Sequence, residues 1–299
     1  MAKGNTSMRT DFQMNPREID FVSRFQNNWE HLTEILGIVS PIKKQPGTMV
    51  KIKRATVTLQ NGAVGEGEDI PYSKAVIDEV PYEEMAVEKY AKAVTLEAIK
   101  EYGYDAAVGM TDDAFLFELQ SRITGKFYTY LNTGTLTGSY ASFQMALSMA
   151  KGLVEDKFKR MRRAATGVVG FVNLLDMYEY LGNANVTVQN QFGFQYIKDF
   201  MGYNTIFLLS GDDMARGKIV ATPVENIVLY YVDPADSDFQ RAGLVYTTVG
   251  DVNLLGFHTE GNYHTAVSEA FAIMGITLFA EYQDAIAVVT VNDGDEAGG

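Results

Sequence analysis

The sequence contains no cysteine, and this absence excludes several kinds of chemistry at once. Disulfide bonds, thiolate nucleophiles, zinc fingers and iron–sulfur clusters all lack the group that they require. A reducing compartment is therefore expected. Stability must come from a packed core, and 46% hydrophobic residues in a chain of 299 are enough to build one in a single large domain or two ordinary ones.

Long apolar runs are missing as well. No stretch reaches the roughly 18 consecutive apolar residues that a membrane-spanning helix needs. The N-terminal sequence MAKGNTSMRTDF lacks the apolar core of a signal peptide. We therefore expect neither membrane spanning nor secretion.

Positive charge is scarce relative to negative charge. The formal net charge of −13 argues against a protein that wraps nucleic acid through its phosphates. One basic cluster offers a local contact with DNA, but its place at the end of an expected helix favours an interaction with the helix dipole and solvent. The cluster consists of Lys157, Lys159, Arg160, Arg162 and Arg163.

Motifs for nucleotide binding are also absent. The segment NGAVGEGEDIPYSK, residues 61–74, has G-x-x-G-x-G spacing, and Glu68 and Asp69 after its last glycine would repel phosphate. GTLTGS at residues 134–139 has no following lysine and joins two expected helices. We therefore expect no bound nucleotide and no cofactor.

Sequence patterns typical of catalytic and metal-binding sites are absent as well. The three histidines of the chain are His31, His258 and His264. The spacing of His258, Glu260 and His264 matches neither a helical zinc site nor a calcium loop. No G-x-S-x-G nucleophile motif occurs, and neighbouring carboxylates such as Asp112 and Asp113 are better explained as cap and surface residues. No catalytic residue and no metal ligand is expected.

The first helix is expected over residues 16–36. Asn15 is a good N-cap, Pro16 suits the first helical position, and Glu18 stands where a capping box requires it. Gly37 is expected to end the helix. Apolar residues recur every three or four positions and form one stripe: Ile19, Val22, Phe25, Trp29, Leu32 and Leu36. This helix must therefore pack against another element.

After residue 47 the periodicity changes to two. Alternating apolar and polar residues in VKIKRATVTLQ, residues 50–60, predict a strand with one wet face. The glycine-rich segment 61–74 follows, and residues 80–99 begin as an extended segment that becomes compatible with a helix. We therefore expect a two-stranded extension with a glycine-rich, acidic tip.

A long helix and an α/β region make up the rest. Asp112 to Leu131 would form a helix about 30 Å long, with Thr111 as its cap. The turn TGTLTGS leads to a second helix, and from residue 167 short apolar strands alternate with helical segments. Further strands follow, and an acidic tail, NDGDEAGG, closes the sequence.

This order of elements resembles the major capsid protein of tailed bacteriophages, which has the Hong Kong 97-like fold. The pieces that carry the resemblance are VEKYAKAVTLEAI before the long helix, VVGFVNLLDMYEYLG, and MARGKIVATPVENIVLYYV. The resemblance covers most of the chain. It implies an α+β fold with an N-terminal arm, an extended β-hairpin loop, a peripheral domain with a long spine helix, and an α/β axial domain.

The resemblance also implies a division of the chain. The expected parts are an N-terminal arm with the amphipathic helix (1–47), the extended loop (48–95), a peripheral domain (96–137 and 236–292), an axial domain (138–235) and a disordered acidic tail (293–299). In this family the arm and the extended loop contact neighbouring subunits. The protein would then be structural and not an enzyme.

The implied partners are other copies of the chain, arranged as hexamers and pentamers in an icosahedral shell. Packaged double-stranded DNA would be held only weakly, a portal and a separate scaffolding protein are expected, and no membrane partner is implied. The location would be the virion, after synthesis in the cytoplasm of a bacterial host. A cross-link through Lys74, as some family members form, has no identifiable asparagine or glutamate partner in this sequence.

Most of the residues proposed for contact between subunits follow from the charges of the extension. A ribbon of two strands is marginally stable alone in water and needs a partner surface. Opposite charges at its two ends would let a head-to-tail ring pair tip with base. The candidates are Glu66, Glu68 and Asp69 at the tip, Lys51, Lys53 and Arg54 at the base, and Trp29 of the first helix.

Two alternatives stay open. An encapsulin, a bacterial shell of the same fold that holds enzyme cargo, also begins with a helix. An α/β enzyme whose active-site residues are distant in sequence is the more distant alternative.

Overall fold

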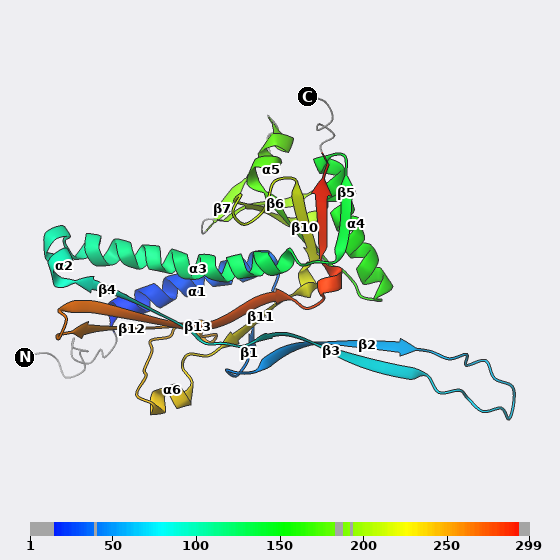
Figure 1. The fold of residues 1–299 in the computed structure, drawn as a ribbon, viewed down its shortest axis with the longest axis horizontal. Helices are drawn as coiled ribbons and strands as arrows, with labels where there is room; N and C mark the ends of the chain where they lie inside the picture. The colour runs from blue at the N-terminus through cyan, green and yellow to red at the C-terminus, as the bar shows by residue number, and fades with distance from the viewer. Residues whose placement is uncertain (1–14, 39–40, 183–187, 192–193, 293–299) are drawn as a thin grey trace, which may run out of the picture.

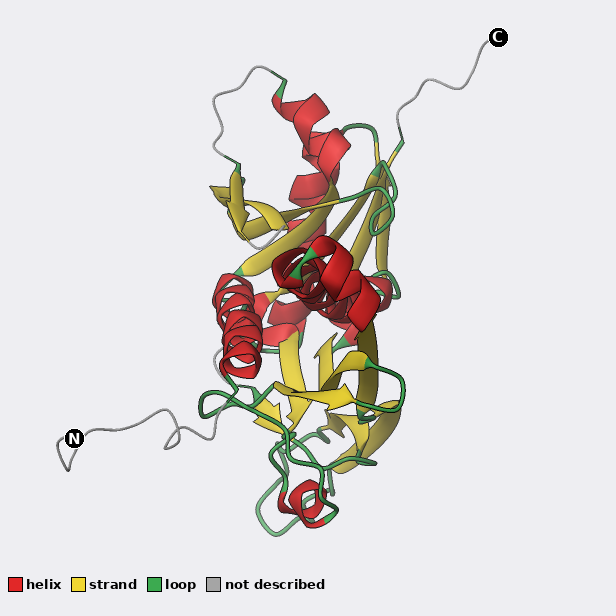
Figure 2. Cartoon of the chain, turned by 90° about the vertical axis from the view of Figure 1, so that its left-hand side faces the viewer, coloured by secondary structure: helices red, strands yellow, loops and turns green. Residues whose placement is uncertain are grey.

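The structure is a computed structural model that describes residues 15–38, 41–182, 188–191 and 194–292, with side chains except at residues 35, 52–57, 77–82, 190, 191 and 194. Two sheets form the body, and a long two-stranded ribbon extends away from it (Figure 1). In the perpendicular view the sheets lie one above the other, with helices between them (Figure 2). Among the described residues, no helix combines the length and apolar character that crossing a bilayer requires.

The five-stranded sheet forms the base of the body. Its strands are β1 (Ile42–Lys43), β11 (Ile227–Val232), β13 (Val267–Ala280), β12 (Leu255–Asn262) and β4 (Glu88–Thr95). Two long helices lie along this sheet, α1 (Pro16–Leu36) and α3 (Met110–Leu131). Phe21 of α1 stacks on Phe257 of β12 with ring centroids 4.0 Å apart, so apolar contact fixes α1 on the sheet.

The seven-stranded sheet forms the upper part. In order across the sheet, its strands are β5 (Leu136–Tyr140), β14 (Ala287–Val291), β10 (Lys218–Pro223), β6 (Val168–Asn173), β9 (Tyr203–Leu209), β8 (Phe194–Phe200) and β7 (Gln189–Gln191). Helix α4 (Phe143–Arg160) packs on it through Ala146, Leu147 and Val154, and α5 (Leu174–Leu181) follows β6. Strand pairs β5–β14 and β6–β9 are parallel, and the other pairs in this sheet are antiparallel.

Short elements connect these parts. Helix α2 (Leu96–Tyr102) and the π-helical turn η2 (Asp105–Gly109) lead from β4 into α3. The 3-10 turns η3 (Val224–Asn226) and η4 (Gln283–Ala285) and the short helix α6 (Ser237–Arg241) complete the body. Strands β2 (Met49–Thr58) and β3 (Lys74–Glu84) form the ribbon.

Helix α1 confirms the predicted boundaries of the first helix. The Asn15 side chain accepts from the Arg17 backbone N–H, and Gly37 ends the helix in the left-handed conformation, φ 73°. Glu18 differs from its expected capping role. Its carboxylate instead accepts from the Thr259 N–H at 2.6 Å and from the Thr247 hydroxyl at 2.5 Å, so a buried acid attaches α1 to the sheet.

The start of the long helix also differs from the prediction. Thr111 is not its cap, because η2 runs directly into α3 and the Thr111 hydroxyl donates back to the Ala107 carbonyl. The predicted turn at 133–139 contains strand β5, which pairs with β14.

The strands of the two sheets depart from the expected domain boundaries. Strand β4 falls in the segment expected to be the extended loop, yet it pairs with β13 in the five-stranded sheet. Strand β14 falls in the segment expected to be peripheral, yet it lies inside the seven-stranded sheet. Strand β11 falls in the segment expected to be axial, yet it pairs with β13 in the five-stranded sheet. In each case the pairing partner is distant in sequence, so local composition could not reveal it. The expected acidic tail, 293–299, and residues 1–14 and 39–40 of the expected arm lie outside the described residues.

Candidate assembly surface

The base of the ribbon is anchored in the body. Val50 of β2 and Met85, the residue after β3, are buried against Val232 and Phe279. The Met85 N–H donates to the Thr48 carbonyl at 3.0 Å. These contacts fix the direction in which the ribbon leaves the five-stranded sheet.

The tip of the ribbon exposes large apolar side chains. Leu59, Ile70 and Tyr72 are 77%, 72% and 97% exposed, and they lie in the segment that joins β2 to β3. In Figure 1 this segment lies at the end of the ribbon, away from both sheets. Large, strongly exposed apolar side chains at such a projection favour a surface that contacts another molecule.

The predicted acidic residues lie at the same tip, and one of them has a local role. The Glu68 carboxylate accepts from the Gly65 N–H at 2.9 Å, and the Glu68 N–H donates to the Gly65 carbonyl at 3.1 Å. Glu68 therefore closes a turn in which Gly67 has a φ of 86°. Glu66 and Asp69 are exposed beside it.

The positive charge at the base of the ribbon is offset by acidic residues on the paired strand. Lys51 is exposed, whereas the side chains of Lys53 and Arg54 lie outside the described residues. The strand register places residue 53 opposite residue 79 and residue 54 opposite residue 78, and these two β3 positions are acidic. Two acids therefore offset these two cations in the formal charge of this segment. Pairing between tip and base stays a prediction.

Trp29 lies in the core and not on the surface. It is 2% exposed and packs beside Phe25 on the buried face of α1, with ring centroids 6.0 Å apart. We therefore remove it from the candidate contact residues. The apolar stripe that identified this helix determined its packing within the chain.

His258, which the sequence places near Glu260 and His264, lies close to Glu18 of α1. His258 Nδ1 lies 3.7 Å from Glu18 Oε1, at the junction between β12 and α1. Within the described ranges, no group of three histidine, aspartate or glutamate residues is arranged to hold a metal ion.

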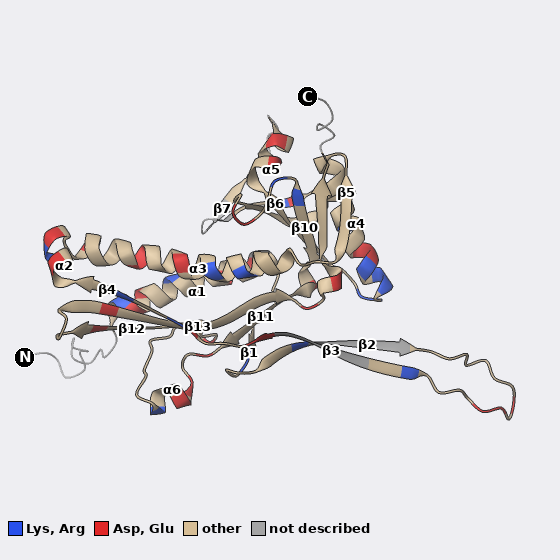
Figure 3. Ribbon diagram, viewed as in Figure 1, with Lys and Arg blue, Asp and Glu red and all other residues tan. Residues whose placement is uncertain are grey.

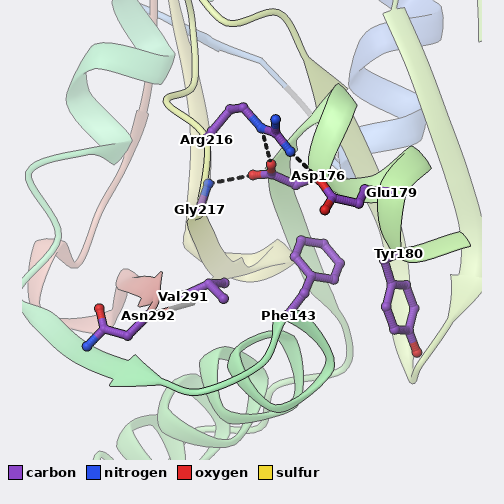
Figure 4. A pocket seen from close by; sticks show the side chains of 8 residues that line it. All are labelled: Phe143, Asp176, Glu179, Tyr180, Arg216, Gly217, Val291 and Asn292. Carbon is purple, nitrogen blue, oxygen red and sulfur yellow. Dashed lines mark hydrogen bonds and ion pairs between the residues drawn. The ribbon is translucent and has the colours of Figure 1, made fainter. Parts of the chain in front are cut away.

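The upper part contains an open polar hollow (Figure 4). Asp176 of α5 accepts from Arg216 Nε at 2.8 Å and from the Gly217 N–H at 2.6 Å, and Glu179 also pairs with Arg216. Hydrogen bonds to Asp176 and Glu179 raise the pKa of the Arg216 guanidinium. Phe143 and Tyr180 also line the hollow. Both carboxylates of α5 bind Arg216, so the cluster holds the loop before β10 against α5.

The basic cluster lies at the end of α4, as the sequence predicted (Figure 3). Lys157 pairs with Asp284 at 2.8 Å, and Arg160 pairs with Asp156 at 2.7 Å. Arg163 lies over the ring of Tyr282, 4.5 Å from its centroid. Three of the five cations therefore have partners within the chain.

Comparison with known proteins defines the fold. No family model matches the sequence, and no curated protein matches it either. A chain from the asymmetric unit of the mature capsid of bacteriophage PhiM1 matches with a TM-score of 0.52 at 11% identity, covering 98% of this chain and 91% of that one. A chain from Mycobacterium phage Patience matches with a TM-score of 0.52 at 9% identity and the same coverage, 98% and 91%.

An encapsulin also matches. A chain of the holo-SrpI encapsulin complex from Synechococcus elongatus has a TM-score of 0.50 at 12% identity, covering 100% of this chain and 95% of that one. The chain thus has the mixed helix and sheet fold that phage capsid subunits and encapsulins share, and the predicted Hong Kong 97-like fold is confirmed.

Sequence reasoning identified the acidic residues of the tip but missed its apolar ones. Leu59, Ile70 and Tyr72 alternate with polar residues like the side chains of any half-buried strand. The one signal that could have identified them is Pro71, which cannot donate a hydrogen bond within a sheet and so favours a tip.

Proposed function

We propose that this chain is the major capsid protein of a tailed bacteriophage. Its copies assemble as hexamers and pentamers into an icosahedral shell that encloses double-stranded DNA. The observation that carries this proposal is the ribbon, whose apolar tip lies far from the core of its own chain. The fold supports it, because a chain of the mature capsid of bacteriophage PhiM1 matches over almost the whole length.

The ribbon suits a repeating contact. Its base is fixed by buried residues, and its tip exposes Ile70 and Tyr72 beside Glu66 and Asp69. A surface that binds a different surface on the next copy generates a ring when the rotation closes. Each contact is small, but a closed ring uses it once for every subunit.

The other proposed partners follow from this role. A portal and a separate scaffolding protein would direct assembly, and the packaged DNA would contact the inner surface weakly. The net charge of −13 supports weak contact, because a strongly basic lumen would retain DNA that must move in and out. The protein would be a structural component of the virion and not an enzyme.

Particle size tests the proposal. The full chain, expressed with and without a co-expressed scaffolding protein, is measured by light scattering and electron microscopy. We expect closed shells built from hexamers and pentamers. A species of 33.1 kDa under every condition would contradict the proposal.

An encapsulin shell is the second candidate. The match to the SrpI encapsulin complex covers the entire chain. The contents of native particles separate the two functions. Packaged double-stranded DNA supports the capsid, whereas a small shell holding an enzyme supports the encapsulin.

A further inference from the structure

An apolar groove lies at the distal end of the five-stranded sheet, between α2 and the turn that joins β12 to β13. Leu96 and Ile99 of α2 line one side of it, and Ala266 and Val267 line the other. Leu96 is 57% exposed. Within the described residues this apolar surface is therefore left partly uncovered.

The N-terminal end of α1 is directed toward this groove. Phe21 stacks on Phe257, and three residues earlier Glu18 accepts a hydrogen bond from the Thr259 N–H. Asn15 Nδ2 then donates to Thr259 Oγ1 at 2.7 Å. Followed toward its N-terminus, α1 thus advances along β12 toward the end of that strand.

The groove lies close to Asn15, the first described residue of the chain, because Asn15 contacts Thr259 and the groove adjoins the following residues of β12. Side chains alternate along a strand, so residue 261 lies on the same face of the sheet as Thr259, about 6.6 Å further on. Gly261 and its register partner Ser268 both line the groove. A side chain at Gly261 would meet open space, so another segment has room to approach the sheet there.

We propose that residues 1–14 of the same chain bind in this groove and that Phe12 and Met14 cover Leu96 and Ile99. A segment of this length spans up to about 46 Å when extended, far more than the few ångströms that separate Thr259 from the groove. The segment contains Lys3, Arg9 and Asp11, whereas α2 exposes Glu97, Lys100 and Glu101. A net positive segment would therefore meet a net negative helix. The proposal does not depend on shell assembly.

Cysteine pairs test the contact directly, because the chain has no cysteine of its own. Phe12→Cys with Ile99→Cys is oxidised in dilute, unassembled protein. The matched control is Phe12→Cys with Gln240→Cys, at an exposed position of α6. We expect a bond within one chain that forms at least ten times faster for the pair with residue 99. Equal rates would overturn the proposal, and so would a bond that forms only between chains, which would make the occupant a second copy.

Hydrogen exchange provides a second measurement without engineered bonds. Phe12→Ser and Met14→Ser together should raise amide exchange several-fold in residues 96–99 and 261–268. Exchange in residues 275–280, where β13 pairs with β11, should stay the same and so confirm that the fold is intact. Unchanged exchange in residues 96–99 would overturn the proposal, whatever the particle size shows about assembly.

Discussion

The Asp112 carboxylate at the start of α3 accepts two hydrogen bonds from the Arg17 guanidinium at the start of α1, at 2.7 and 2.9 Å. Lys92 of β4 pairs with the same carboxylate at 2.5 Å. Three elements that are far apart in the sequence therefore meet at one buried acid. This cluster attaches the N-terminal helix to the long helix and to the sheet.

Replacing Asp112 with asparagine should destabilise the subunit. Arg17 and Lys92 would lose their charged acceptor while they remain largely buried, and the expected cost is roughly 1 to 3 kcal/mol. Urea denaturation of unassembled protein, followed by circular dichroism, measures this cost.

Asp113→Asn is the matched control. Asp113 is the next residue and pairs with Arg24 at 2.7 Å, but both side chains are largely exposed. Its loss should cost less than about 1 kcal/mol. Equal effects of the two substitutions would mean that burial of Asp112 contributes nothing.

The same carboxyl predicts a dependence of stability on pH. Burial alone would raise the pKa of Asp112, but hydrogen bonds and ion pairs with Arg17 and Lys92 outweigh it and lower that pKa. A lowered pKa in the folded state stabilises the protein above the unfolded value of about 4, and this contribution disappears as the pH falls through the folded value. Denaturation between pH 2 and 7 should therefore show a steeper acid loss for the natural chain than for Asp112→Asn. Parallel curves would contradict this assignment.

The apolar tip should be required for assembly but not for folding. Ile70→Ser with Tyr72→Ser removes two exposed side chains, so the unfolding midpoint of the subunit should stay the same while shells fail to form. Leu244→Ser serves as the control, because Leu244 is an exposed apolar residue of the body. Light scattering and electron microscopy report assembly. Normal shells from the tip variant would show that its apolar residues make no essential contact.

The acidic tip should control the salt dependence of assembly. Reversal of Glu66, Glu68 and Asp69 to lysine would place positive charge where pairing with a basic surface is proposed. We expect assembly to weaken most at low salt, because screening reduces both attraction and repulsion as salt rises. Glu66→Lys with Asp69→Lys, which keeps the Glu68 turn, separates charge from loop structure. An unchanged salt profile in both variants would exclude the pairing.

Two glycines near the end of α3 should respond in opposite ways to alanine. Gly125 lies inside α3, and a side chain there would meet open space, so Gly125→Ala should stabilise the subunit by about 1 kcal/mol. At Gly134 an added Cβ would lie 2.6 Å from the Ile286 carbonyl oxygen, so Gly134→Ala should be destabilising by about 1 to 3 kcal/mol. Thermal unfolding of unassembled protein measures both changes. The same sign for both would refute the packing described at Gly134.

Helix boundaries could be predicted where the signals are local. Asn15, Pro16 and Gly37 determined the ends of α1, because capping involves residues within a few positions of each other. The prediction that Thr111 caps the long helix was wrong, because η2 continues directly into α3 and no helix begins at Thr111. Strand β5 was missed because the strand with which it pairs, β14, is about 150 residues away.

The sequence by itself determined the excluded chemistries, the alternation that makes the ribbon, and the periodicity that makes the long helices. These properties depend on composition and on neighbours along the chain. Only the tertiary structure decided that Asp112 and Glu18 are buried junctions and that Trp29 is a core residue. It also decided that Ile70 and Tyr72 are exposed, in the segment that joins β2 to β3. Burial and exposure depend on which distant segments meet in space, and no local pattern of residues records that.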